Sequence, residues 1–255
     1  MGATFSSCQG TKQSAPVAFA AMTNSEFAGQ SFIQKSLANP RSPISVLSFW
    51  FGLDMQDSKS KEELHTGSYH KKMEKLWFFG GSEFDDLCKP FSEVVRDAGR
   101  KNLVSDENVD WDSVDGKLSQ LILCDQFSRN CFRGSDEAFE YDETALELAN
   151  HLADRCLSDD PDFYGSYSLF LVLAFMHSEQ LDDHKTGQKV VEKAKITCPD
   201  VDWNQTKWFL KNHTDVIERF GRYPHRNRQY GRETTKEEQE WLASPDVPGW
   251  AKSQG

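Results

Sequence analysis

The apolar residues from about residue 42 onward recur at helical spacing, and no segment alternates apolar and polar residues as a half-buried strand would. In one such segment, Phe84, Leu87, Phe91 and Val94 fall on one face of a helix. The polar stretches between these segments are short, which favours antiparallel packing of consecutive helices. The pattern therefore predicts an all-α fold, built as an antiparallel bundle or superhelix.

Capping signals divide this pattern into separate helices. Ser42 and Pro43 fit a helix start, Gly52 fits the left-handed position after a helix end, and Thr235 with Glu238 forms a capping box. The expected helices span residues 42–52, 82–99, 116–130, 143–157, 166–184, 187–197, 203–220 and 235–244. The helix 166–184 has no polar face in its first half, so we expect it to be the most buried. The polar stretch 54–75 is expected to be a poorly packed insertion.

The two ends of the chain differ from this helical part. The first 41 residues are rich in Ser, Ala and Gln and contain a single acidic residue, Glu26. Such a composition buries too little apolar surface to order a chain, which predicts a disordered tail. We therefore expect a tail over residues 1–41, a helical domain over 42–245 and a C-terminal tail over 246–255.

Charge and cysteine content exclude several classes of protein. The chain has a net charge of −11, which disfavours nucleic acid as a partner because the overall field repels phosphate. No run of 18 apolar residues is present, as a membrane-spanning helix would need. The six cysteines form no CxxC pair, so we predict buried, reduced thiols, no metal site and no cofactor.

Four polar and aromatic motifs carry a family resemblance. They are Val46–Gly52, Leu121–Asn130 with Arg133 and Gly134, Met176–Glu179, and Phe220–Asn227 followed by Gly231, Arg232 and Thr235–Glu238. Their order and spacing resemble a bacterial-type family of unknown function, number 924, over about 200 residues. The resemblance implies a tetratricopeptide-like helical fold and no established activity. Ser128 departs from the family pattern, which usually has proline there, so the kink expected at that position could be absent.

The motifs gather arginine in a chain that is acidic overall. Five arginines lie between residues 219 and 232, and Arg129 and Arg133 are one helical turn apart. Guanidinium groups bind carboxylate and phosphate through paired hydrogen bonds, which predicts a site for a small anionic ligand. The candidate residues are Asp125, Gln126, Arg129, Asn130, Arg133, His177, Ser178, Glu179, Arg222, His225, Arg226 and Asn227.

The same residues also fit a purely structural role. Asp125 can pair with Arg129 along the helix, and a buried polar network can lock helices together without binding anything. Under either interpretation, these side chains are costly to bury without partners. We therefore expect Asp125, His177 and at least one of Arg222, His225 and Arg226 to lie within about 10 Å of one another.

These observations favour an interaction protein with a polar Arg/His pocket, which would bind a protein partner through a helical groove. The alternative is an enzyme that acts on a small carboxylate or phosphate in the same pocket, with His177 and His225 as candidate acid–base groups. No G-x-S-x-G elbow surrounds Ser178, which disfavours a serine hydrolase. His177 and His184 share a helical face, but two histidines alone do not make a zinc site.

The N-terminus offers a lipidation pattern. Gly2 and Ser6 match the N-myristoylation sequence, and Cys8 is placed for palmitoylation as a second anchor. This predicts a cytoplasmic protein held at a membrane surface. The alternative is a transit sequence that is removed near residue 41, which would leave a protein of an organelle matrix. The first 41 residues are Ser-rich and acid-poor, as in such sequences. However, Arg41 is their only arginine, whereas transit sequences are rich in arginine.

Overall fold

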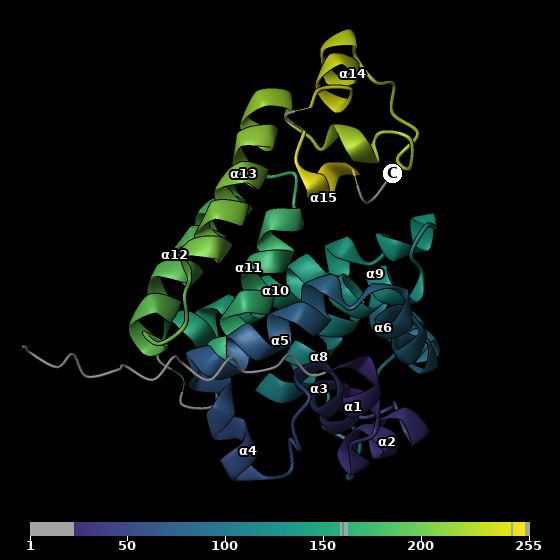
Figure 1. Cartoon of the computed structure of the whole chain (residues 1–255), viewed down its shortest axis with the longest axis vertical. Coiled ribbons are helices and arrows are strands. Elements are labelled where there is room, and N and C mark those ends of the chain that lie inside the picture. The colour runs from purple at the N-terminus through teal and green to yellow at the C-terminus, as the bar shows by residue number, and fades with distance from the viewer. Residues whose placement is uncertain (1–22, 159, 161–162, 246, 253–255) are drawn as a thin grey trace, which may run out of the picture.

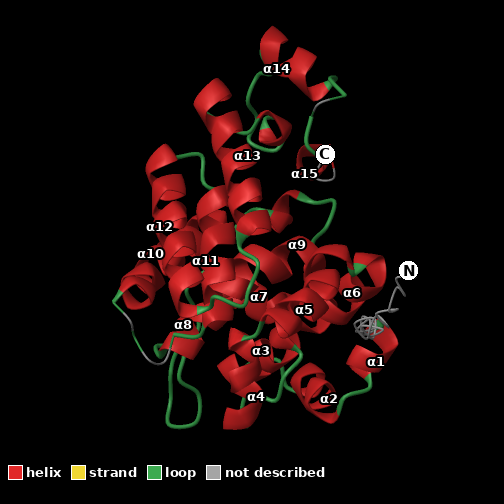
Figure 2. Cartoon of the chain, turned by 60° about the vertical axis from the view of Figure 1, so that its left-hand side comes forward, coloured by secondary structure: helices red, strands yellow, loops and turns green. Residues whose placement is uncertain are grey.

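The computed structural model describes residues 23–158, 160, 163–245 and 247–252. These residues form helices and loops and contain no strand (Figure 2), which confirms the predicted all-α class. The helices are α1 (Asn24–Ala28), α2 (Ser31–Ala38), α3 (Pro43–Phe51), α4 (Ser58–Glu62), α5 (Gly67–Phe79), α6 (Gly81–Cys88), α7 (Ser92–Gly99), α8 (Val114–Ile122), α9 (Ser128–Cys131), α10 (Asp142–Leu157), α11 (Gly165–His177), α12 (Leu181–Thr197), α13 (Asn204–Phe220), α14 (Lys236–Leu242) and α15 (Gly249–Lys252). Short 3₁₀ turns lie at η1 (Glu63–His65), η2 (Lys89–Phe91), η4 (Asp136–Ala138) and η5 (Pro224–Arg226), and η3 (Leu123–Phe127) is a π-helical segment.

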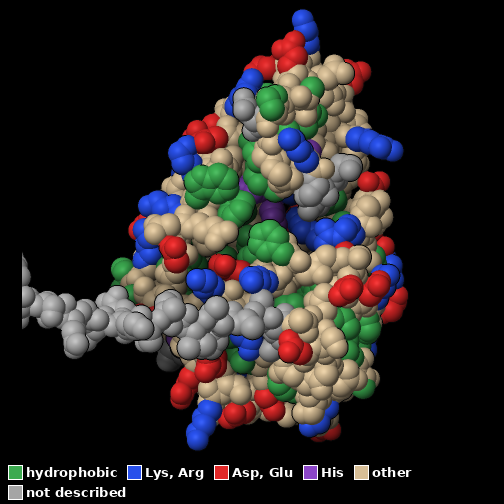
Figure 3. All heavy atoms as spheres, in the orientation of Figure 1, with side chains coloured by type: hydrophobic (Ala, Val, Ile, Leu, Met, Phe, Trp, Pro, Cys, Tyr) green, Lys and Arg blue, Asp and Glu red, His purple; other side chains and the backbone are tan. Residues whose placement is uncertain are grey.

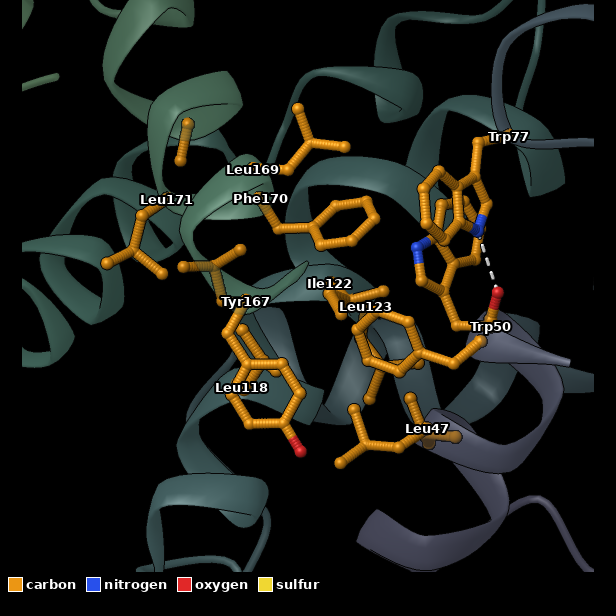
Figure 4. Close-up of a cluster of buried hydrophobic side chains, with 14 of the residues drawn as sticks. Leu47, Trp50, Trp77, Leu118, Ile122, Leu123, Tyr167, Leu169, Phe170 and Leu171 are labelled. Carbon is orange, nitrogen blue, oxygen red and sulfur yellow. Dashed lines mark hydrogen bonds between the residues drawn. The ribbon is translucent and has the colours of Figure 1, made fainter. Parts of the chain in front are cut away.

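Helix α11 lies at the centre of the molecule, between α10, α12 and α13 (Figure 1). Apart from Leu173 and His177, every residue of α11 is buried, as its lack of a polar face predicted. Figure 4 shows how its side chains meet those of α3, α5 and α8 in one apolar core. In that core, the Trp77 Nε1 donates a hydrogen bond of 2.8 Å to the carbonyl oxygen of Trp50, so the indole is buried without losing its partner.

The predicted capping residues act as expected. Ser42 Oγ accepts a hydrogen bond of 3.1 Å from the backbone N–H of Ser45, and Gly52 ends α3 with a φ of 59°. At α14, Thr235 and Glu238 each accept a hydrogen bond from the other's backbone N–H, which completes the capping box. These local signals need no tertiary partner, which is why the sequence alone locates them.

The helix expected over residues 166–184 is two helices. α11 ends at His177, and α12 begins at Leu181, earlier than the expected residue 187. Ser178 adopts an extended backbone, and its hydroxyl oxygen accepts a hydrogen bond of 3.1 Å from the N–H of Gln180. The break leaves His177 at the last position of the buried helix, where a site can form.

The stretch 54–75 is not a poorly packed insertion. It forms α4, η1 and most of α5, and it buries Met55, Leu64, Tyr69 and Met73. The prediction failed because these apolar residues are separated by many charged ones, so their average is polar. The positions that face the core are nevertheless apolar, and those positions decide the packing.

Both expected tails are partly folded. Residues 1–22 lie outside the described residues, but α1 and α2 follow, with Phe27 and Ile33 fully buried. The folded part therefore begins before residue 42. At the other end, α15 buries Ala251, and the ring of Trp250 stacks on His213 with centroids 3.9 Å apart. Single apolar residues within otherwise polar segments make these contacts. An average over the composition of the segment does not reveal such residues.

Candidate functional site

The centre of the polar site is a hydrogen bond between His177 and Asp125. His177 Nδ1 lies 2.7 Å from Asp125 Oδ1, and the other carboxylate oxygen accepts a hydrogen bond of 2.6 Å from Gln126 Nε2. Asp125 belongs to η3, the π-helical segment that interrupts the helix expected over 116–130. The backbone N–H of Ser128 donates to the carbonyl oxygen of Leu123, five residues back, so the helix is widened at this point although Ser128 is not proline. Such π-bulges are frequent at functional sites.

Asp142 joins two arginines beside this pair. Its Oδ1 lies 3.0 Å from Arg129 Nη1, and its Oδ2 lies 3.2 Å from Arg226 Nη1. Arg129 also lies 3.4 Å from Asp125 Oδ1, and Arg226 donates a hydrogen bond of 2.9 Å to the carbonyl oxygen of His177. The three motifs that carry Asp125, His177 and Arg226 therefore meet in space, as predicted.

A cavity of about 260 Å³ adjoins His177. Its walls come from α10, from the end of α11 and from the chain between α13 and α14, and the lining residues are Asp142, Glu143, Leu146, Ala174, His177, Ser178, Glu179, Arg226, Tyr230 and Arg232. Figure 3 shows His side chains beside Lys or Arg side chains where the C-terminal helices meet the rest of the molecule. The site thus forms between elements that are distant in the sequence.

Burial sets the protonation state of the central pair. Burial lowers the pKa of His177 more than the neighbouring Asp125 raises it, so the imidazole is neutral near pH 7. Burial alone would raise the pKa of Asp125, but His177 and Arg129 outweigh it and lower the pKa of this carboxyl group. Because Asp125 is ionised, it accepts the hydrogen of Nδ1, and Nε2 of His177 carries the lone pair. Among the described residues, none forms a hydrogen bond with Nε2.

Comparison with known proteins gives a family. The family model described as "bacterial protein of unknown function (DUF924)" matches residues 46–246. The chain belongs to this family. The solved structure of a protein of unknown function from Agrobacterium tumefaciens is similar at 30% sequence identity and a TM-score of 0.52, over 66% of this chain and 88% of that chain. No curated protein matches the chain.

In this DUF924 chain, four of the twelve predicted site residues line the cavity: His177, Ser178, Glu179 and Arg226. Asp125, Gln126 and Arg129 lie behind His177 and hold it in place. The hydroxyl of Ser178 donates a hydrogen bond of 2.5 Å to Asp183 Oδ2 and accepts one of 3.1 Å from the N–H of Gln180. The role of each residue in binding stays a prediction.

The other five predicted residues serve elsewhere. Arg222 and Asn227 both bind Glu238 of α14, at 2.6 Å and 3.1 Å. Arg133 forms a two-pronged ion pair with Asp85. Asn130 donates a hydrogen bond to the carbonyl oxygen of Gln126. His225 packs against Trp250, with ring centroids 5.4 Å apart. Apart from Asn130, whose bond lies within its own helical segment, these side chains join separate elements, so the structural interpretation applies to this part of the predicted set.

Six of the residues that line the cavity were missing from the predicted set, among them Asp142, Tyr230 and Arg232. Arg232 lies in the arginine-rich segment but was not singled out, and it forms a two-pronged ion pair with Glu179 at 2.7 Å and 2.9 Å. Tyr230 is 47% exposed beside it. Asp142 opens α10 and looks in the sequence like an ordinary acidic residue of a first helical turn. No local signal marks it, because its role depends on two arginines from other elements.

The described part of the chain contains no group of three or more His, Cys, Asp or Glu side chains arranged to hold a metal ion. Within the same residues, no helix is long and apolar enough to cross a bilayer. The five described cysteines form no disulfide with one another, and burial raises the pKa of Cys124 and Cys131, which keeps these two thiols protonated.

Proposed function

We propose that the cavity binds a small carboxylate or phosphate molecule and that His177 transfers a proton to or from it. The observation that carries this proposal is the hydrogen bond of 2.7 Å between His177 Nδ1 and Asp125, which fixes the tautomer and leaves Nε2 as a base. A buried carboxylate in this position also stabilises the imidazolium that forms when the base takes up a proton. Nε2 can take a proton from a water molecule as its oxygen attacks the ligand, or from an acidic C–H whose electron pair stays on the ligand, so no nucleophilic side chain is required.

The arginines at the cavity supply donors for an anionic ligand. Each guanidinium has five N–H donors, and only some of those of Arg226 and Arg232 are used by Asp142, Glu179 and backbone carbonyl groups. Because the carboxylates already balance the positive charge, the site favours a ligand that presents oxygens to several donors over a strongly charged polyanion. This supports a compact carboxylate or phosphate as the substrate class.

A thermal-shift screen of small carboxylates and phosphates tests the binding step. A ligand at 100 times its dissociation constant stabilises the protein by about 2.7 kcal/mol, which raises Tm by about 5–10 °C for a chain of this size. Arg232→Ala should abolish the ligand-induced shift, whereas Arg219→Ala, which removes an arginine from a surface pair, should leave it unchanged. A panel without any shift, or an equal shift in both variants, would contradict the proposal.

Proton transfer is then measured on a ligand found by the screen. Incubation in D₂O, followed by NMR, detects hydrogen exchange or conversion of the compound. His177→Gln should retain the ligand-induced shift and lose the reaction, and His151→Gln on the exposed face of α10 is the matched control. Unchanged turnover in His177→Gln would contradict the catalytic role and leave the binding role in place.

Fewer observations support our expectation of a protein partner in a helical groove than support the ligand site at His177. The groove between α12 and α13 encloses about 560 Å³ and contains Trp208, which is 57% exposed. However, Lys207 pairs with Glu192 and Lys211 with Asp215, so its charges are already neutralised within the chain. A protein partner at this groove stays a prediction.

We further propose that Gly2 is myristoylated and Cys8 palmitoylated, which would hold the protein at a membrane surface. Both residues lie outside the described part of the chain. Removal of a transit sequence near residue 41 would delete α1 and α2, whose Phe27 and Ile33 are fully buried, and this supports the lipid interpretation. Gly2→Ala should release the protein from the membrane fraction, and Cys8→Ser should weaken its attachment. An intact mass with unmodified Gly2, or a chain that begins near residue 42, would contradict acylation.

A further inference from the structure

Helix α5 exposes a face that combines lysine with phenylalanine. At 100° per residue, Lys71, Lys72, Lys75, Phe78 and Phe79 fall within an arc of about 120°. The opposite arc carries the buried residues of the helix, Tyr69, His70, Met73, Leu76 and Trp77. Figure 1 shows α5 on the near side of the molecule, and Figure 3 shows Lys or Arg side chains over it.

The lysines of this face differ from most others in this chain. The charge of Lys71 acts on Glu74 and opposes the rise in the pKa of that carboxyl group, but no close ion pair forms. Lys71, Lys72 and Lys75 form no ion pair among the described residues. By contrast, most other lysines are paired with Asp or Glu, including Lys61, Lys89, Lys101, Lys117, Lys185, Lys195, Lys207, Lys211 and Lys236. Glu74 is the one acidic residue on the helix, and it lies at the edge of the face, half-buried. In a protein of net charge −11, three unpaired lysines on one helix form a local positive strip.

Two phenylalanines continue the strip at the C-terminal end of α5. Phe78 is 43% exposed and Phe79 is 75% exposed, although the preceding Trp77 is buried. Adjacent exposed aromatic rings are unfavourable in water but suit the boundary between lipid headgroups and acyl chains. A helix with basic residues followed by aromatic residues on one face is the arrangement that surface-bound helices use.

The chain enters the folded part beside these rings. Asn24, at the start of α1, donates a hydrogen bond of 3.2 Å from Nδ2 to the carbonyl oxygen of Gly80, the residue after Phe79. The ring of Phe27 packs against Phe84, with centroids 5.8 Å apart, which fixes α1 on α6. Residues 1–22 therefore join the fold at the same end of α5 as the phenylalanine pair, and a lipid on Gly2 or Cys8 would be tethered there.

We propose that the α5 face formed by Lys71, Lys72, Lys75, Phe78 and Phe79 docks on anionic membrane surfaces, with the lysines on lipid phosphates and carboxylates and the phenyl rings between the headgroups. This face extends the proposed membrane attachment but does not require the lipid anchor. A single acyl chain binds a membrane only marginally, and a basic patch is one of the second signals that make attachment stable. The location of the patch beside the N-terminal segment lets both signals act on one membrane.

Vesicle binding by the full chain with an unmodified Gly2 tests the α5 face alone. The vesicles are phosphatidylcholine, with or without phosphatidylserine, and binding is measured by co-sedimentation. The protein should bind the anionic vesicles only, and binding should weaken as salt increases. The triple variant Lys71→Glu, Lys72→Glu, Lys75→Glu should lose at least about tenfold in partition coefficient. Phe78→Ser with Phe79→Ser should lose about as much while keeping the salt dependence.

The matched control changes net charge without touching α5. Lys35, Lys59 and Lys189 are exposed, lie on three other helices and form no ion pair in the described structure, so their triple change to Glu should leave vesicle binding within about twofold. An equal loss in this control would overturn the proposal, because only net charge would then matter. Absence of binding, equal binding to neutral vesicles, or capture of a soluble acidic peptide in place of vesicles would overturn it too. An unmodified Gly2 in cells would contradict only the acylation.

Discussion

His70 lies in the aromatic core without a charged partner. It is 4% exposed, its Nε2 lies 2.5 Å from Ser166 Oγ, and the rings of Tyr69, Trp77 and Trp203 surround it. Burial lowers the pKa of His70 to about 4. The imidazole is therefore neutral in the folded protein across the pH range in which the unfolded chain takes up a proton.

This shift predicts a loss of stability in mild acid. Below pH 6.5 the unfolded chain binds a proton at His70 that the folded chain does not, so stability falls until about pH 4. Between these pH values, the change in the free energy of unfolding that is due to this residue approaches about 1.4 kcal/mol per pH unit. Urea unfolding between pH 7 and 4 measures it. His70→Gln should remove this part of the slope and the exposed His151→Gln should not, whereas equal slopes in all three proteins would contradict the prediction.

At the functional site, individual residues were predictable where burial forced a pairing. Asp125 lies on the same predicted face as Leu118 and Leu121, so a cation or several donors had to reach it. The requirement did not say which arginine would do so. Arg226 is held by a hydrogen bond to the carbonyl oxygen of His177 and by an ion pair with Asp142. Neither contact has a sequence signature.

On the scale of elements, a part-buried ion pair that ends in the first turn of α14 helps to attach this helix. Arg222 donates to both oxygens of Glu238, at 2.6 Å and 2.9 Å, and this is the main cause that lowers the pKa of Glu238 to about 2. Glu238 is 2% exposed and also closes the capping box with Thr235. The pair therefore joins a loop to a helix that has few buried residues of its own.

Arg222→Ala should loosen α14, because it leaves the buried carboxylate of Glu238 without its main partner. We expect a loss of about 1–3 kcal/mol in the free energy of unfolding. The neighbouring pair of Arg219 with Glu237 is exposed on both sides, so Arg219→Ala should cost less than about 0.5 kcal/mol. Chemical denaturation gives both values. If the two variants prove equally stable, the prediction is wrong and α14 is held by other contacts. Small anions should not restore the stability that Arg222→Ala loses.

Helix boundaries were predictable where a local cap defines them. Ser42, Gly52 and Thr235 act within one turn of their own helix, so their function survives without knowledge of the fold. The boundary between α11 and α12 has no such marker. It depends on the extended backbone of Ser178, whose hydroxyl bonds forward to Asp183.

For the whole molecule, periodicity, capping and composition determined the helical class and the buried position of α11. Those quantities depend on residues close together in the chain, because helical hydrogen bonds and helical faces are local. The motifs also determined that a buried carboxylate, an imidazole and arginines would need one another. A requirement of this kind follows from desolvation and is independent of the fold.

Only the tertiary structure decided which of these groups share the cavity and which lock helices. Arg222 and Arg226 are four residues apart in the same motif, yet one binds Glu238 and the other reaches His177. Only the fold, likewise, brought Asn24 beside Gly80 and left the lysines of α5 unpaired. Contacts between distant residues depend on how helices pack, and packing is fixed by the shape of the whole core, which no single segment encodes.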